Sequence, residues 1–69
     1  MLTKEDIQRL RAEAKHFREH AKAAREEAAR CGAKYDWIGK LKAKCRASEY
    51  VRDAQERDRM IKTFRDAAA

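Results

Sequence analysis

The chain has 69 residues, no proline, two glycines, two cysteines and a formal net charge of +6. This length allows one small domain, and alanine supplies 14 of its hydrophobic residues, so a single chain has little core. No apolar run approaches the length of a membrane span or a signal sequence, and two cysteines are too few for a disulfide framework, so we expect a cytoplasmic protein without disulfides.

The first predicted helix covers residues 3–31 and carries a regular apolar seam. Its apolar residues recur at alternating spacings of three and four, which is typical of a helix that packs lengthwise against another helix. Thr3 and Asp6 have the spacing of a capping box, and Gly32 is the expected left-handed stop. The seam is bulky at first and then mostly alanine. It comprises Ile7, Leu10, Ala14, Phe17, Ala21, Ala24, Ala28 and Cys31.

A short turn at residues 32–36 leads to a second predicted helix at residues 37–67, with Asp36 as its N-cap. So brief a connection makes the two helices adjacent and antiparallel. We therefore expect an all-α fold in which residues 1–69 form one helical hairpin. The face that should pack against the alanine half of the first helix contains Ile38, Leu41, Cys45 and Ser48.

The apolar stripe of the second helix changes sides around residues 46–49, because the later apolar residues fall on nearly the opposite face. Either the helix breaks there and a third helix folds back, or one continuous helix packs its second half on another chain. Neither glycine nor proline marks a break, so we favour the continuous helix and a homodimeric four-helix bundle. The expected dimer interface comprises Ile7, Leu10, Phe17, Tyr50, Ala54, Ile61 and Phe64.

Candidate chemistry is sparse. His16 and His20 stand one helical turn apart and could chelate a transition metal, but no third ligand is near in sequence, so we interpret them as surface residues. On a contact surface they would weaken binding at acid pH. The sequence has no nucleophile–base pair, phosphate loop or cofactor motif. We therefore expect a non-enzymatic protein with no catalytic, metal or cofactor residues.

The best chemical lead is a basic patch at residues 37–48, a segment that contains no acidic residue. Glu26 and Glu27 of the first helix could neutralise part of it, which would leave only a solvated flank. Aromatic residues bracket the turn beside the patch, and aromatics next to cations are common in protein-binding hot spots and can also stack on bases. The predicted partner-binding residues are Arg25, Tyr35, Trp37, Lys40, Lys42, Lys44 and Arg46.

A basic, alanine-rich hairpin of this length resembles two groups of proteins. Its architecture is similar to that of the plasmid copy-number regulator Rop, a hairpin that dimerises into a four-helix bundle and binds paired RNA loops. Its length, helical content and Ala/Arg-rich composition resemble those of the small helical proteins with which Pseudomonas phages disable host regulators. One of these is a quorum-sensing anti-activator that binds LasR and a pilus-assembly ATPase. Neither resemblance carries a shared motif, so neither assigns functional residues.

These observations predict a homodimeric protein-binding module. The phage resemblance implies an inhibitor, or anti-activator, of a host transcriptional regulator that acts in the host cytoplasm. The alternative is a nucleic-acid-binding hairpin that acts through the basic patch at residues 40–46. Acidic residues spread through both helices count against it, because nucleic-acid-binding proteins usually keep acids off the contact face. Passive assembly through coiled-coil contacts is a third possibility. We expect no membrane partner.

Overall fold

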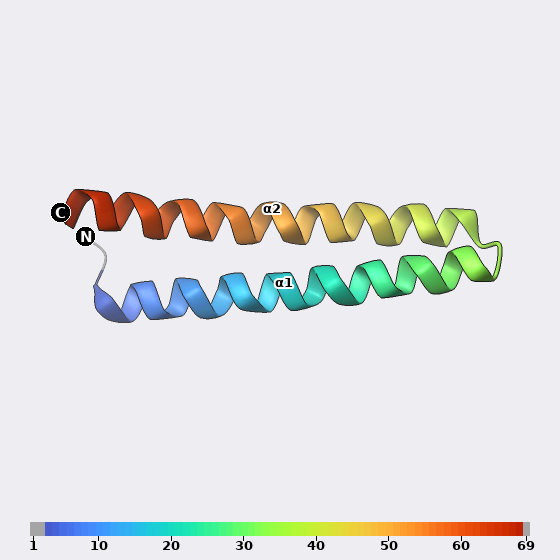
Figure 1. Ribbon diagram of the computed structural model, residues 1–69, viewed down its shortest axis with the longest axis horizontal. Coiled ribbons are helices and arrows are strands. Elements are labelled where there is room, and N and C mark those ends of the chain that lie inside the picture. The colour runs from blue at the N-terminus through green and yellow to red at the C-terminus, as the bar shows by residue number, and fades with distance from the viewer. Residues whose placement is uncertain (1–2, 69) are drawn as a thin grey trace.

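The computed structural model describes residues 3–68 as two long antiparallel helices (Figure 1). α1 spans Lys4–Ala33 and α2 spans Trp37–Ala68, so the predicted all-α hairpin is confirmed. A rise of about 1.5 Å per residue makes α2 about 48 Å long, which accounts for a molecule of 51 × 15 × 14 Å. α2 runs through residues 46–49 without a break, as favoured from the sequence. Neither helix, over residues 3–68, is long and apolar enough to cross a membrane.

Side-chain caps fix the start of each helix. The Thr3 hydroxyl accepts the Asp6 N–H at 3.2 Å and the Asp6 carboxylate accepts the Thr3 N–H at 3.0 Å, which forms the predicted capping box. The hydrogen bond from the Thr3 backbone lowers the pKa of Asp6, so the cap is complete at neutral pH and is lost only as this carboxyl protonates in acid. The Asp36 carboxylate accepts the Gly39 N–H at 2.9 Å, which confirms the second cap.

The turn differs from the sequence prediction in where the chain reverses. Gly32 is still helical, and the residue in the left-handed conformation is Tyr35, with a φ of 59°. The Asp36 N–H donates to the Cys31 carbonyl at 2.8 Å and the Tyr35 N–H donates to the Gly32 carbonyl at 3.1 Å, as in a Schellman motif. The predicted stop at Gly32 is wrong because α1 continues through Ala33, a strong helix former.

The seam of α1 packs against α2 as the sequence predicts. Phe17 and Cys31 are half-buried on it, and every other seam residue is buried. Ala14 and Ala21 are each only 1% exposed, so the backbone of α2 passes very close to them. The buried positions of α1 are Ile7, Leu10, Ala14, Ala21, Ala24 and Ala28.

The packing face of α2 is not the one expected. Ile38 and Leu41 are 72% and 64% exposed, and Cys45 and Ser48 are also exposed, so the predicted stripe faces away from α1. The true seam keeps the same three-four spacing along the whole helix and does not change sides. It comprises Lys40, Ala43, Ala47, Tyr50, Ala54, Arg57, Ile61 and Phe64.

Two basic residues occupy seam positions of α2 and interrupt its apolar repeat in the sequence. The half-buried Arg57 places its guanidinium carbon 4.8 Å from the centre of the Phe17 ring and donates to Glu13 at 3.4 Å. The half-buried Lys40 places its ammonium nitrogen 5.3 Å from the centre of the Trp37 ring. Long basic side chains can cover apolar surface with their stems while their charged heads reach polar or aromatic partners. Both therefore occupy seam positions without burying a bare charge.

All seven residues that the sequence assigned to a dimer interface lie between α1 and α2 of one chain. Ile7, Leu10 and Ile61 form a buried cluster with Phe64 packed against it. The premise that the α2 stripe turns away from α1 is therefore wrong, because these side chains already cover one another within the hairpin. The residues are Ile7, Leu10, Phe17, Tyr50, Ala54, Ile61 and Phe64.

The buried alanines provide a test of this register. Ala54 is 2% exposed, so Ala54→Leu should push the helices apart and lower the free energy of unfolding by about 1–3 kcal/mol. Ala23→Leu is the matched control, because Ala23 is exposed on α1 and the same change there should alter stability by less than about 0.5 kcal/mol. Chemical denaturation followed by circular dichroism measures both. Equal stability of the two variants would contradict the observed seam.

Candidate functional site: an exposed apolar patch beside a basic groove

Large apolar side chains gather on the surface at the turn. We call Tyr35, Trp37, Ile38 and Leu41 the turn patch; their exposed fractions are 78%, 60%, 72% and 64%. Ile38 and Leu41 lie one helical turn apart on the outward face of α2, and the Tyr35 and Trp37 rings meet edge to face with centroids 6.2 Å apart. An exposed cluster of this kind on a small protein is typical of an interaction surface.

The backbone conformation at Tyr35 in the turn patch is unfavourable for a residue with a side chain. Tyr35 is the C′ residue of α1 and has a positive φ of 59°, a conformation in which glycine is the favoured residue. A residue with a Cβ atom costs roughly 1–2 kcal/mol there. The chain thus places a solvent-exposed aromatic ring where its own folding favours glycine, which points to a role for the ring outside the fold.

The predicted basic patch is divided between two sides of α2. On one side, the Arg46 guanidinium donates to the Glu27 carboxylate of α1 at 2.6 Å. Glu27 therefore neutralises the charge of Arg46, as the sequence analysis allowed. Lys40 lies in the seam against Trp37, while Lys42 is exposed. The structure therefore brings Lys40 next to the turn patch and separates Arg46 from it.

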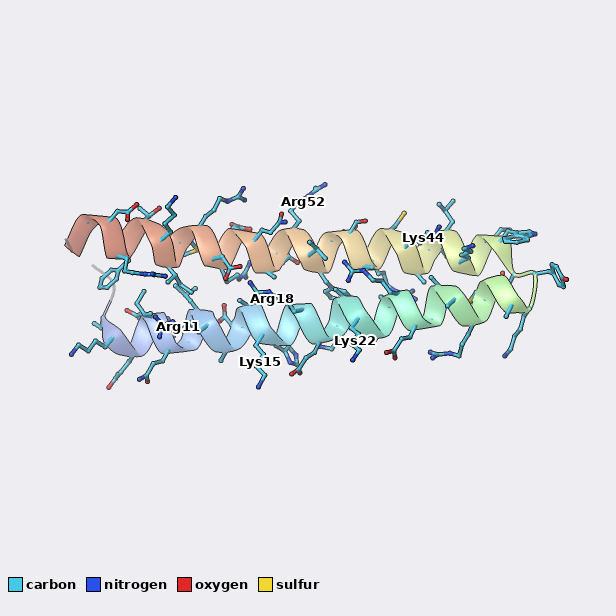
Figure 2. All side chains as sticks on the ribbon, viewed as in Figure 1. Arg11, Lys15, Arg18, Lys22, Lys44 and Arg52 are labelled. Carbon is cyan, nitrogen blue, oxygen red and sulfur yellow. The ribbon has the colours of Figure 1, made fainter. Side chains whose placement is uncertain are left out.

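A groove between the helices adjoins the turn patch and has a volume of about 770 Å³. Its floor is made of small side chains, including Ala28 and Ala47, and its walls carry four basic residues and no acidic residue. Figure 2 shows Lys44 and Arg52 on the α2 side of the molecule. The basic residues that line the groove are Arg25, Lys40, Lys44 and Arg52. Sequence reasoning found the first three and missed Arg52, which lies beyond the basic segment.

The histidines and cysteines form no evident reaction centre. His16 and His20 are exposed, with their Nε2 atoms 2.8 Å apart, and the His20 ring lies 5.2 Å from that of Tyr50. Within the described part of the chain no three His, Cys, Asp or Glu side chains converge as metal ligands. Cys45 is exposed, so the expectation that it packs in the seam is wrong.

Comparison with known proteins gives no identity. No protein family model, no curated protein and no solved structure matches this chain. The function must therefore be argued from the surface itself.

Sequence reasoning missed Ile38 and Leu41 as site residues because it used them for the core. The signal that would have placed them outside is the continuous three-four repeat from Lys40 to Phe64, which leaves residues 38, 41 and 45 on the opposite face. Lys40 and Arg57 interrupt that repeat when only apolar residues are counted.

Replacing Tyr35 tests the strained turn. Tyr35→Gly should raise the free energy of unfolding by about 1 kcal/mol relative to Tyr35→Ala, because only the glycine relieves the positive φ. Tyr35→Ala is the matched control for loss of the ring, since both variants lack it. Thermal and urea unfolding measure the difference. If the two variants are equally stable, the turn does not hold residue 35 in the left-handed conformation.

Proposed function

We propose that this protein is a non-enzymatic protein-binding module that uses the turn patch to bind an apolar surface with an acidic rim on another protein. The exposure of Ile38 and Leu41 carries the proposal, because the hairpin completes its seam without them. Burying a large apolar side chain contributes roughly 1.5–3 kcal/mol, so four such residues supply enough driving force for a specific contact. Trp and Tyr are also the residues most enriched in binding hot spots.

Charge around the turn patch favours an acidic partner over a second copy of the chain. No acidic residue occurs between Trp37 and Ser48, and Lys42 and Lys44 are exposed on the same stretch of α2. Two copies that met through this patch would bring like charges together, which opposes association. A partner with Asp or Glu around an apolar contact would instead pair with these lysines.

Inhibition is the mode of action that suits such a module. An exposed apolar patch on a small hairpin can act by occupying a surface that its partner needs for another contact. The resemblance to small phage proteins extends the proposal to an anti-activator of a host transcriptional regulator. The alternative, nucleic-acid binding through residues 40–46, has less support because Glu27 pairs with Arg46 and Lys40 lies against Trp37.

The turn patch can be tested by removing its exposed aliphatic residues. The protein is used to capture partners from its native host, and the captured protein is identified and purified for direct titration. The Ile38→Ala/Leu41→Ala variant should bind this partner at least about tenfold more weakly, since two hot-spot contacts are lost. Its unfolding midpoint should stay unchanged, because both side chains are exposed.

Met60→Ala is the control for that experiment, because Met60 is a large exposed apolar residue far along α2 from the turn. It should bind the partner within about threefold of the unmodified protein. Unchanged affinity in the double variant would contradict the assignment of the turn patch. A captured nucleic acid with no protein would contradict the proposed function as a whole.

Homodimerisation into a four-helix bundle stays a prediction. Because the bulky seam residues are covered within one chain, a dimer must use surface outside the seam. Sedimentation equilibrium at micromolar concentration measures the assembly. A mass near twice 8.1 kDa supports the dimer, and a mass of 8.1 kDa contradicts it.

A further inference from the structure

Positive charge is concentrated along one edge of the hairpin. Residues seven apart on a helix lie in nearly the same row. On one side of the α1 seam, the rows 4/11/18/25 and 8/15/22/29 hold six basic residues and no acidic residue. The six are Lys4, Arg11, Lys15, Arg18, Lys22 and Arg25. Figure 2 labels four of them along α1.

The rows of α2 that face this side continue the same charge. Rows 44/51/58/65 and 41/48/55/62 add Lys44, Lys62 and Arg65, and their one acidic residue is Asp58, which pairs with Arg18. We call these four rows the basic edge. Nine basic residues and one acidic residue give it a formal charge of +8, more than the +6 of the whole chain. The rest of the surface is therefore slightly acidic.

The opposite edge shows that this hairpin can form salt bridges between its helices. There Arg57 pairs with Glu13 at 3.4 Å and Arg46 pairs with Glu27 at 2.6 Å. On the basic edge, over residues 3–67, only Arg18 has a carboxylate oxygen within 4.0 Å. Repulsion between the like charges along this edge opposes folding, and the salt bridges within the described part of the chain do not offset it. An external polyanion would compensate them.

Two grooves on this edge bring cations from both helices together. The larger groove, of about 770 Å³, is lined by Arg25 of α1 and Lys44 of α2. A second groove, of about 270 Å³, lies toward the open end and is lined by Lys4, Arg11 and Arg65. Neither groove has an acidic residue in its lining. Anionic groups can thus approach between the helices at both ends of the rod.

We propose that the basic edge binds the phosphate backbone of duplex nucleic acid. From Arg11 to Arg25 a basic residue occurs on average every 3.5 positions, which is about 5 Å along the axis. From Lys4 to Arg25 the basic residues extend over about 32 Å. A straight, evenly spaced row of cations matches a polymer with evenly spaced negative charge better than it matches the irregular charges of a folded acidic protein.

The side chains of the basic edge favour a duplex over a single strand. Proteins that bind single strands stack bases on aromatic rings, and the one aromatic residue in line with the four rows is Trp37, seven residues before Lys44 at the turn end. Phe17 and Tyr50 lie between the helices, and Tyr35 and Trp37 lie at the turn. Along most of its length the edge therefore offers contacts to phosphates and no ring for base stacking, so we expect binding with little sequence preference.

This inference goes beyond the proposed protein-binding function and rests mainly on different residues, with Lys44 shared by the two surfaces. Binding to labelled duplexes of about 20 base pairs, as DNA and as RNA, is measured by fluorescence anisotropy. Such a duplex is about 68 Å long and exceeds the 51 Å length of the protein. Contact with about five phosphates should weaken binding at least a hundredfold between about 50 and 200 mM salt.

The decisive variant is Arg11→Gln/Lys15→Gln/Lys22→Gln, which removes three exposed cations without breaking a salt bridge. It should reduce the slope of log K against log salt by about 2–3. The matched control, Arg30→Gln/Lys42→Gln/Arg59→Gln, removes the same charge from outside the basic edge and should leave the slope nearly unchanged. Circular dichroism confirms that both variants are folded.

Three results would overturn the inference. The first is no binding to either duplex at about 50 mM salt, a condition that favours phosphate contacts. The second is an equal loss of affinity in the two triple variants, which would show attraction to net charge alone. The third is binding to polyglutamate or to anionic lipid vesicles as tight as binding to duplex. Ile38 lies outside the four rows, so the Ile38→Ala variant should keep full duplex affinity, and failure of this inference and failure of the protein-binding proposal are distinguishable.

Discussion

Close approach of the two helices along a seam of alanines is the constraint on which the rest of the structure depends. Ala14 and Ala21 of α1 and Ala43 and Ala54 of α2 are almost completely buried. Alanine loses no side-chain entropy on burial, so it allows close packing at little conformational cost, but it also removes little apolar surface from water. Near the turn the seam of α2 contains Ala43 and Ala47, and the larger Leu41 lies outside it.

Most of the larger apolar residues lie toward the two ends of the rod, and Phe17 and Tyr50 pack between the helices near its middle. At the open end, where no covalent link holds the helices, Ile7, Leu10 and Ile61 are buried together with Phe64 against them. At the other end the Schellman turn and the Asp36 cap hold the helices. Apolar side chains are not needed for the seam there, which leaves the turn patch free for contact with another molecule.

Much of this fold follows from the sequence, because α1 repeats without interruption and its caps are local. The packing face of α2 could not be predicted from the sequence, because the basic residues Lys40 and Arg57 occupy two of its seam positions. Only the structure shows the aromatic and acidic partners that allow their charged heads to lie there. Because the wrong face of α2 was predicted to pack on α1, Ile38 and Leu41 were expected in the core. The residues that do form the core were then assigned to a dimer interface. One misjudged stripe accounts for both errors.

The candidate sites were predictable to different degrees. Five of the seven predicted partner-binding residues line the groove or belong to the turn patch, namely Arg25, Tyr35, Trp37, Lys40 and Lys44. The basic edge was not found, because charge summed over consecutive residues mixes opposite faces of a helix. Glu19 and Lys22 are close in sequence but belong to different rows. Charge must be summed by row once the seam is known.

The two proposed surfaces are not independent, because the larger groove lies where they adjoin. Lys44 lines that groove, belongs to the basic edge and stands three residues from Leu41 in the turn patch. An acidic rim that neutralises Lys44 and Arg25 would remove the turn end of the row of cations available to phosphates. Bound protein would then weaken duplex binding, and linkage requires bound duplex to weaken protein binding by the same factor. We therefore expect the two proposed ligands to compete at this groove, although most of their contacts are separate.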